Sequence, residues 1–347
     1  MTEPLLRVEN LQTHFASELG TIKAVDGVSF DIPRGGILGM VGESGSGKSV
    51  TGLSILRLLG SRNATIAGGR ILFRGEDLLT KSEAEMRAIR GGSISMVFQN
   101  AMTSLDPFFR VGEQLVEVLR LHQGLSKKEA REKALHALEL VRIPDPVAKL
   151  KSYPHQLSGG QRQRVVVALA LACEPDLLIA DEPTTALDAT VQKQIIELLQ
   201  EINQELGTAI LMVTHDMGVV AHMCRTVAVM YAGRIVERGP AAEVLQAPQH
   251  PYTRALMASV PRLHDTRTAL TDTHNHRRGR HLFEIGGVPP VPIGLGEGCP
   301  FSARCPEVRD ECATVAPPTV AFEPRHEAVC HARAEVRSEE VVQRVGA

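Results

Sequence analysis

Residues 37–49 read ILGMVGESGSGKS and are the most informative part of the chain. The first five are apolar or small at every position, which is typical of a strand buried on both faces. The next eight match the pattern G-x-x-x-x-G-K-[ST], in which glycines let backbone amides surround phosphate oxygens at the N-terminus of a helix. A glycine-rich turn without a ligand is the alternative, but the full match also comes with a preceding strand and a following helix. We therefore predict a phosphate-binding loop.

Each polar residue of this motif, and of a second one, has a predicted role. Lys48 is expected to reach the β and γ phosphates of a nucleotide, and the Ser49 hydroxyl to coordinate Mg²⁺. Asp181 and Glu182 follow the apolar run 177–180, where acids are costly unless they take part in chemistry. We assign Asp181 to the magnesium shell and Glu182 to the attacking water as general base, with a solvated acidic turn as the alternative. The predicted nucleotide-binding residues of the loop are Gly42, Ser44, Gly45, Gly47, Lys48 and Ser49.

The rest of the first 247 residues predicts the organisation of the fold. Apolar runs at 177–180, 209–213 and 227–230 are candidates for further buried strands. From residue 191 to 206 apolar residues recur at spacings of three or four, as on one face of a helix. This alternation predicts an α/β domain with a mostly parallel sheet. Between about 100 and 165 the strand signal is missing and a helix is expected to begin at Ser126, capped with Glu129, so this stretch is predicted to be an inserted helical subdomain.

The composition excludes several classes of function. The 347 residues include 38 Lys and Arg against 40 Asp and Glu, and this net charge of −2 excludes a globally basic nucleic-acid binder. Aromatic residues are 3% with no Trp, which leaves few rings to stack on single-stranded nucleic acid. The longest apolar run is the nine residues 165–173, whereas a membrane-spanning helix needs about 20. Because residues 1–10 also lack the features of a secretion signal, we expect a cytoplasmic protein that does not itself cross a membrane.

Residues 157–161 read LSGGQ and lie about 20 residues before Asp181. With the phosphate-binding loop, this spacing makes the chain resemble the ABC ATPase family. On the same resemblance Gln99 corresponds to the Q-loop, Asp188 to the D-loop and His215 to the switch histidine. Phe15 lies where the family places an aromatic residue that stacks on adenine, with a Phe in the core as the alternative.

The resemblance implies a head-to-tail dimer that holds ATP and Mg²⁺ between the phosphate-binding loop of one subunit and residues 158–161 of the other. Ser158 and the amides of Gly159 and Gly160, at a helix N-terminus, are expected to donate hydrogen bonds to the γ-phosphate. Glu182, His215 and Gln99 are the expected catalytic residues of an active ATPase. The expected binding residues outside the loop are Phe15, Gln99, Ser158, Gly159, Gly160, Gln161, Asp181 and Asp188, with Ser49, Gln99 and Asp181 at the magnesium ion.

After about residue 247 the chain becomes rich in proline and polar residues, which predicts a linker and a small module. Residues 250–256 (HPYTRAL) and 299–306 (CPFSARCP) resemble the tail of ATPases from oligopeptide, dipeptide and nickel importers. The expected organisation is an ABC domain at 1–247 and a C-terminal extension at 248–347. The implied function is the ATP-hydrolysing subunit of a bacterial peptide importer, with a nickel or metal-chelate importer as the alternative. A soluble ABC ATPase outside transport and a P-loop kinase or GTPase are less favoured.

The resemblance also implies partners. A cassette without a membrane span is expected to drive two permease subunits at the cytoplasmic face of the inner membrane. A second ABC subunit, identical or different, completes the dimer, and an extracytoplasmic substrate-binding protein acts indirectly; no nucleic acid is expected. Residues 100–107 (NAMTSLDP) are similar to the stretch that borders the permease groove in peptide importer cassettes. Asp106 and Phe108 are the candidate contacts, with a structural loop as the alternative.

Four of the six cysteines fall in the C-terminal extension, at Cys299, Cys305, Cys312 and Cys330. In a cytosolic protein, four such thiols suit metal ligation better than disulfides. Their spacings match neither the usual paired cysteines of zinc sites nor the compact ferredoxin run. The tail that this segment resembles is associated with an iron–sulfur cluster, so a [4Fe-4S] cluster is the expectation, with zinc or simply packed free thiols as alternatives.

Overall fold

The computed structural model describes residues 3–99, 104–185, 187–259, 285–323 and 325–334. Its centre is an eight-stranded sheet with the strand order β11-β12-β10-β9-β3-β8-β7-β6. Neighbouring strands from β9 to β6 are parallel, and β10 (Arg234–Pro240) is antiparallel to β9. The parallel strands are β6 (Ile94–Val97), β7 (Leu177–Asp181), β8 (Ala209–Thr214), β3 (Ile37–Val41) and β9 (Thr226–Tyr231). The predicted α/β fold with a mostly parallel sheet is confirmed.

A second, antiparallel sheet lies against one face of the central sheet, and the sequence patterns did not reveal it. Its strand order is β2-β1-β4-β5, and α1 (Lys48–Ile55) contacts strands of both sheets. A hydrophobic core fills the space between them, with fully buried residues such as Val25, Met40 and Ile179. The remaining elements of this part are β1 (Leu6–Ser17), β2 (Gly20–Ile32), β4 (Ala64–Phe73), β5 (Glu76–Asp77), η1 (Leu78–Thr80) and α2 (Glu83–Ile89).

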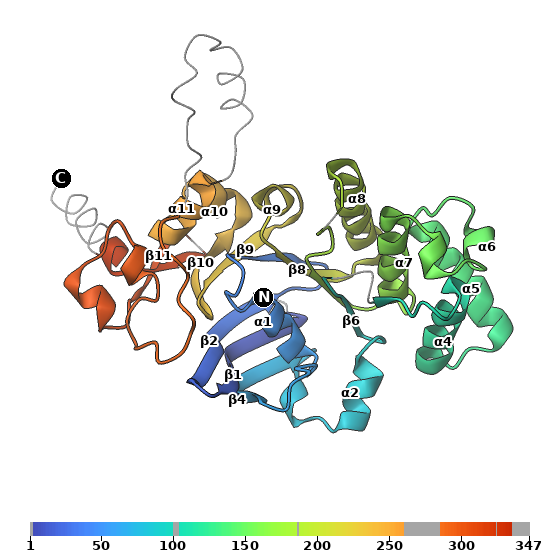
Figure 1. The fold of residues 1–347 in the computed structure, drawn as a ribbon, viewed down its shortest axis with the longest axis horizontal. Helices are drawn as coiled ribbons and strands as arrows, with labels where there is room; N and C mark the ends of the chain where they lie inside the picture. Colours follow the sequence, from blue (N-terminus) through green and yellow to red (C-terminus); the bar gives the residue numbers. More distant parts are fainter. Residues whose placement is uncertain (1–2, 100–103, 186, 260–284, 324, 335–347) are drawn as a thin grey trace, which may run out of the picture.

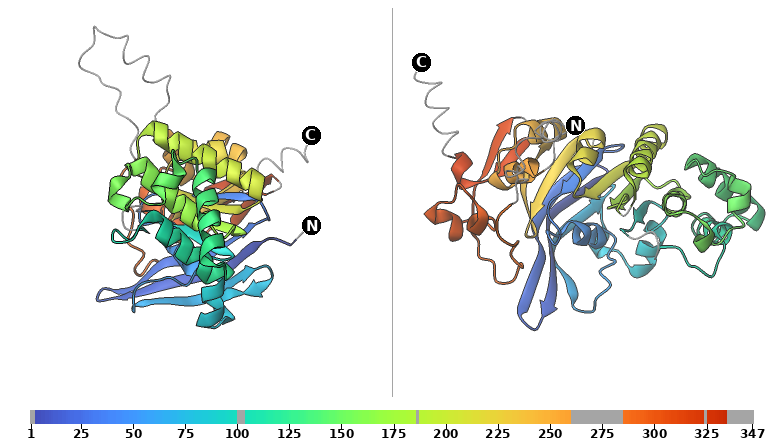
Figure 2. Two further views of the ribbon diagram at one scale, coloured as in Figure 1. Left: turned by 90° about the vertical axis from the view of Figure 1, so that its right-hand side faces the viewer. Right: turned by 45° about the horizontal axis from the view of Figure 1, so that its top comes forward.

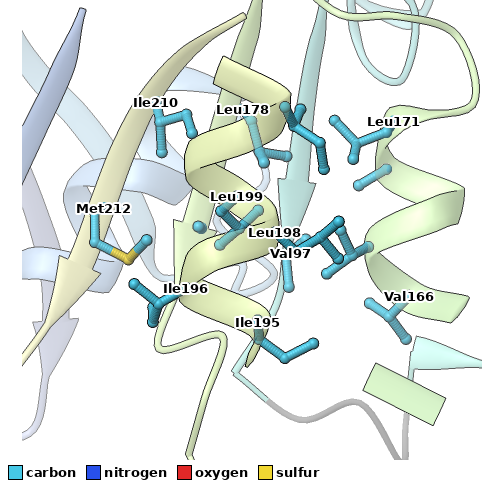
Figure 3. Packing of buried hydrophobic residues seen from close by; sticks show 14 of the residues in the cluster. Val97, Val166, Leu171, Leu178, Ile195, Ile196, Leu198, Leu199, Ile210 and Met212 are labelled. Carbon is cyan, nitrogen blue, oxygen red and sulfur yellow. The ribbon is translucent and has the colours of Figure 1, made fainter. Parts of the chain in front are cut away.

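Helices cover the opposite face of the central sheet (Figure 1). The longest of them, α8, repeats its apolar residues at helical spacing, and Leu199 is fully buried. Figure 3 shows these side chains packed between strands of the sheet and α7. Burial of one such side chain stabilises the fold by about 1.5–3 kcal/mol. The helices of this face are α8 (Ala189–Leu206), α9 (Met217–Met223), α10 (Ala241–Gln246) and α11 (Pro251–Ala258).

The helical subdomain stands at one end of the central sheet (Figure 1). Ser126 caps α5, because its hydroxyl accepts a hydrogen bond from the Glu129 amide and the Glu129 carboxylate accepts one from the Ser126 amide. Its elements are α4 (Val111–Gln123), α5 (Lys127–Leu140), α6 (Pro146–Lys149), η2 (Pro154–Gln156) and α7 (Gly159–Leu171). None of the helices in the described parts of the chain is long and apolar enough to span a bilayer.

The C-terminal extension joins the other end of the same sheet, as the right-hand view of Figure 2 also shows. Its strands β11 (Thr319–Glu323) and β12 (His326–Val329) add to the edge next to β10, with Arg238 paired to Glu327. The fully buried Phe301 ring lies 5.2 Å from the ring of Tyr231 in β9. Two 3₁₀ turns, η3 (Ser302–Arg304) and η4 (Asp310–Ala313), complete this part. The extension therefore packs on the cassette, and the domain boundary at residue 247 stays a prediction.

Candidate nucleotide-binding site

The phosphate-binding loop connects β3 to α1, and two of its glycines are required by the close approach of other backbone. Gly42 has a φ of 149°, and a Cβ there would lie 2.1 Å from the carbonyl oxygen of Met230. Gly47 has a φ of 103°, and a Cβ would lie 2.2 Å from the carbonyl oxygen of Ala24. Only glycine fits either position. The loop is thus locked against β9 and β2 while its amides stay at the N-terminus of α1.

Lys48 is the basic residue of this loop. Its side chain is 5% exposed, and the ammonium donates to the carbonyl oxygens of Gly42 (2.8 Å) and Glu43 (2.9 Å). Burial lowers the pKa of the Lys48 ammonium, while the carboxylates of Glu182, Asp181 and Glu43 act in the opposite direction. A cation held in so dry a place attracts phosphate oxygens more strongly than one in water does.

Ser49 and Asp181, the predicted magnesium ligands, meet across the site. The Ser49 hydroxyl donates to Asp181 Oδ1 at 2.9 Å, and Asp181 ends the buried strand β7. Burial raises the pKa of Asp181, and the hydrogen bond from Ser49 lowers it in part. A hydroxyl and a carboxylate oxygen side by side are the hard donors that Mg²⁺ prefers. Gln99, the third predicted ligand, directs its amide to Glu182 instead.

Glu182 lies at the centre of the residues that are predicted to be catalytic. Gln99 Nε2 donates to its Oε2 at 2.8 Å, and His215 Nδ1 lies 3.1 Å from its Oε1. Burial alone would raise the pKa of Glu182, but the hydrogen bonds from His215, Thr185 and Gln99 outweigh it and leave the pKa lowered. The carboxylate is therefore ionised at neutral pH, as a general base must be. The backbone of Glu182 has a φ of 46°, which is left-handed, a conformation that costs about 1–2 kcal/mol in a non-glycine residue.

Thr185 is a site residue that the sequence analysis missed. Its hydroxyl donates to Glu182 Oε2 at 2.9 Å, from the turn directly after the acid pair. The signal was its position three residues after Glu182, where a turn brings a hydroxyl back onto the preceding acid.

The segment 158–161 begins α7, whereas the phosphate-binding loop leads into α1. Ser158 caps α7, because its hydroxyl accepts from the Gln161 amide at 3.3 Å. Ser158 and Gly159 are exposed, whereas a Cβ on Gly160 would lie 2.8 Å from Val191 Cγ1. Figure 1 shows α7, the part of the helical subdomain nearest the sheet, apart from α1. An exposed helix N-terminus of this kind is open to a phosphate from another molecule.

The positions of Asp188 and Phe15 do not test the roles predicted for them. Asp188 caps α8, with Oδ1 accepting from the amides of Thr190 (3.1 Å) and Val191 (3.0 Å). Phe15 is half-buried on β1, opposite Ile22 of β2. The roles assigned to both residues at the nucleotide stay predictions.

The prediction of an iron–sulfur cluster in the C-terminal extension is wrong. Its four cysteines, Cys299, Cys305, Cys312 and Cys330, are free thiols. Among the described residues no group of three or more His, Cys, Asp or Glu side chains is arranged to hold a metal ion. Burial raises the pKa of Cys299 to about 11, and it also raises the pKa of Cys305 and of Cys330, whereas a metal needs the thiolate. The zinc alternative fails for the same reason, and Cys299 and Cys305 pack against the hydrophobic core.

Two regions of the chain match known protein families. Residues 25–185 match the family described as ABC transporter. Residues 236–312 match the family described as Oligopeptide/dipeptide transporter, C-terminal region. The two matches cover the phosphate-binding loop with its acid pair, and the first part of the extension.

Curated relatives match nearly the whole chain. The dipeptide transport ATP-binding protein DppD of Bacillus subtilis is 50% identical over 91% of this chain and 90% of its own length. The oligopeptide transport ATP-binding protein OppD of Salmonella typhimurium is 48% identical over 94% of this chain and 93% of its own. A probable peptide ABC transporter ATP-binding protein of Sinorhizobium fredii is 49% identical over 97% of this chain and 96% of its own.

Solved structures of cassettes are also similar. A dimeric bacterial ABC transporter cassette is 28% identical, with a TM-score of 0.61 over 68% of this chain and 98% of its own. The same cassette has been solved as a dimer in a post-hydrolysis state bound to ADP and phosphate, with a TM-score of 0.60, 28% identity and the same coverage of both chains.

Proposed function

The chain belongs to the ATP-binding subunits of ABC transporters, in the group that carries the oligopeptide/dipeptide transporter C-terminal region, and from this premise we propose that it hydrolyses ATP to drive the import of dipeptides or oligopeptides. The observation that carries the proposal is the convergence of three groups: the buried Lys48, the Ser49–Asp181 pair and the Glu182–Gln99–His215 cluster. They follow β3, β7, β6 and β8, whose carboxyl ends meet at one edge of the parallel sheet.

The residues of this edge divide the chemistry of hydrolysis among them. Lys48 and the amides of the loop bind the β and γ phosphates. Ser49 and Asp181 would hold Mg²⁺, which would neutralise part of the phosphate charge. Glu182 accepts a proton from the water that attacks the γ-phosphorus, and ADP leaves with its new charge held by Lys48. His215 and Gln99 keep the Glu182 carboxylate aimed, because each contacts a different oxygen of it.

A second cassette completes the site in this proposal. The exposed N-terminus of α7, at Ser158 and Gly159, supplies hydrogen-bond donors to the γ-phosphate bound by the partner's loop. ATP then stabilises the closed dimer, and hydrolysis lets it open, because the two states differ in their contacts to the nucleotide. The dimeric cassette that the chain resembles supports this arrangement. The partner cassette is an identical or a related chain.

As a member of this group the chain works with membrane permeases, from the cytoplasmic face of the inner membrane. We propose two permease subunits and, beyond the membrane, a substrate-binding protein that delivers the peptide. The turn 106–109 is the proposed permease contact. Gln114 fixes it, since its side-chain amide donates to the carbonyl oxygens of Asp106 and Phe109 and its carbonyl accepts from the Asp106 amide, each at 3.0 Å. Phe108 is 85% exposed on this rigid turn and Phe109 is 54% exposed.

Truncating the aromatic pair tests the partner assignment. We expect Phe108→Ala/Phe109→Ala to lose its permeases when the tagged chain is purified from native membranes and co-purifying proteins are identified by mass spectrometry. Two buried aromatic anchors typically contribute about 2 kcal/mol or more each to an interface. Leu19→Ala removes a side chain that is 83% exposed on the β1–β2 hairpin and is expected to keep the permeases. Recovery of only soluble nucleic-acid or ribosomal partners with the wild-type chain would overturn the transport function and leave the ATPase.

A further inference from the structure

Arg304, in the C-terminal extension, reaches into the phosphate-binding loop. Its Nη1 donates to Glu43 Oε2 at 2.7 Å and its Nη2 to Glu43 Oε1 at 3.1 Å. Glu43 is the second residue of the loop, directly after Gly42. The Arg304 side chain is 5% exposed and that of Glu43 is 24% exposed, so this two-point ion pair is mostly buried. One side chain of the extension thus fixes the position of a loop residue more than 250 places earlier in the chain.

Every N–H donor of Arg304 is used. Besides the two bonds to Glu43, Nη1 also donates to the Tyr231 hydroxyl at 3.1 Å, Nη2 to the Ile285 carbonyl oxygen at 3.0 Å, and Nε to the Gly286 carbonyl oxygen at 2.8 Å. A guanidinium has five N–H donors in a fixed plane. Because none is left over, the group is placed to orient Glu43 and residues 285–286 of the extension rather than to bind a further anion.

The backbone of Glu43 also bonds to the extension. Its N–H donates to the hydroxyl of Tyr252 in α11 at 2.8 Å, and its carbonyl oxygen accepts from the Lys48 ammonium at 2.9 Å. The ring of Tyr252 lies 4.6 Å from that of Tyr231. The backbone of this one residue therefore connects the extension on one side to the phosphate-binding lysine on the other.

The segment 285–305, which we call the C-terminal brace, contacts the other wall of the site as well. Ile293 pairs with Ile22 of β2, and the Lys23 amide donates to the Pro292 carbonyl oxygen at 2.8 Å. Ile22 lies opposite Phe15 on β1. Arg234 connects the brace to β2. It donates to the carbonyl oxygens of residues 296–298 and also pairs with Asp26 of β2. One continuous segment thus spans from the strand pair carrying Phe15 to the phosphate-binding loop.

We propose that Arg304 is a positioning residue for ATP binding: it neutralises Glu43 and holds the loop so that Lys48 and the loop amides face the phosphates. An unpaired carboxylate at this position repels a polyphosphate ligand, and a displaced loop loses aligned donors. The inference rests on the proposed ATPase function and makes the C-terminal brace part of the nucleotide site. Its effect is on ground-state binding, since Arg304 contacts none of Gln99, Glu182 and His215.

The test compares steady-state ATP hydrolysis by five full-length chains: wild type, Arg304→Met, Glu43→Gln, the Arg304→Met/Glu43→Gln double variant, and Arg254→Met. Arg254 also lies after residue 247 and pairs with Glu307 at 2.8 Å, so its loss removes an ion pair that does not touch the loop. We expect Arg304→Met to raise the KM for ATP about tenfold or more, as small misplacements of binding groups do, with a much smaller change in kcat. Arg254→Met is expected to keep the wild-type KM.

The double variant separates positioning from a merely structural role. If Arg304 acts through Glu43, removing it in the Glu43→Gln background leaves the KM within about threefold of that of Glu43→Gln alone. A double variant whose KM is tenfold above that of Glu43→Gln, or an Arg304→Met chain with the wild-type KM, overturns the proposal. The comparison of the double variant with Glu43→Gln still tests the proposal if Arg304→Met alone does not fold. If the wild-type chain does not hydrolyse ATP, the ATPase function itself is refuted. Failure of the positioning proposal and failure of the ATPase function are therefore distinguishable.

Discussion

Replacing Glu182 with Gln is expected to reduce kcat for ATP hydrolysis by about 10²–10⁴-fold, the usual contribution of a general base. The amide keeps the size of the side chain and can still contact Gln99, Thr185 and His215, but it accepts no proton from water. ATP binding is expected to stay near the wild-type level, because Glu182 contacts neither Lys48 nor Ser49. Phosphate release and ATP affinity, measured on the same preparation, check both parts.

Two further readouts sharpen this prediction. Glu197→Gln is a matched control, because Glu197 is a half-buried acid of α8 that pairs with Lys193 along the helix, at 3.6 Å. It is expected to hydrolyse ATP at the wild-type rate. The Glu182→Gln chain, which binds ATP without cleaving it, is also expected to stay dimeric in ATP by size-exclusion chromatography. Hydrolysis at the wild-type rate by Glu182→Gln would remove the general base from the mechanism.

Replacing Lys48 with Ala is expected to weaken ATP binding by about 10–100-fold and to abolish measurable hydrolysis. A charge-assisted hydrogen bond typically contributes about 1.5–3 kcal/mol, and this one forms in a buried site. The variant also leaves the carbonyl oxygens of Gly42 and Glu43 without the ammonium that both contact. Titration calorimetry with ATP measures the affinity directly.

Lys128→Ala is the control for Lys48→Ala, since Lys128 is an exposed lysine on α5 in the helical subdomain. Its ATP affinity and turnover are expected to equal those of the wild type. A Lys48→Ala chain that binds and hydrolyses ATP like this control would show that residues 42–49 are a structural turn. The thermal unfolding midpoint of each variant separates loss of binding from loss of folding.

Much of the candidate nucleotide-binding site, at the edge of the sheet where the parallel strands end, could be predicted from short stretches of sequence. Residues 37–49 combine a buried strand, a glycine loop and a helix start, and each is set by local chemistry. The positions of Asp181 and His215 could be predicted because Asp181 ends β7 and His215 directly follows β8, and the carboxyl ends of parallel strands meet at one edge of a sheet. The partner of Gln99 was less predictable: its amide contacts Glu182 rather than the Ser49–Asp181 pair, because a loop side chain is positioned by tertiary contacts.

The C-terminal extension was the part that sequence alone described least well. Cysteine spacing indicated a metal site, but spacing carries no information on whether thiols face a common centre or the core, and these thiols do not form a metal site. The contact of Arg304 with Glu43 joins positions 261 residues apart, and no periodicity or motif reports such a pair. The antiparallel sheet β2-β1-β4-β5 was missed because long, half-exposed strands with bulges do not give continuous apolar runs.

ATP hydrolysis by this chain is expected to drive peptide uptake. The most direct measurement is the uptake of radiolabelled dipeptides and oligopeptides by cells in which the chain is replaced by its Glu182→Gln variant. We expect uptake with the wild-type chain and none with Glu182→Gln, and we expect the variant still to co-purify with the permeases. Peptide uptake that continues with Glu182→Gln, or uptake of nickel or metal chelates instead of peptides by the wild-type cells, would contradict it.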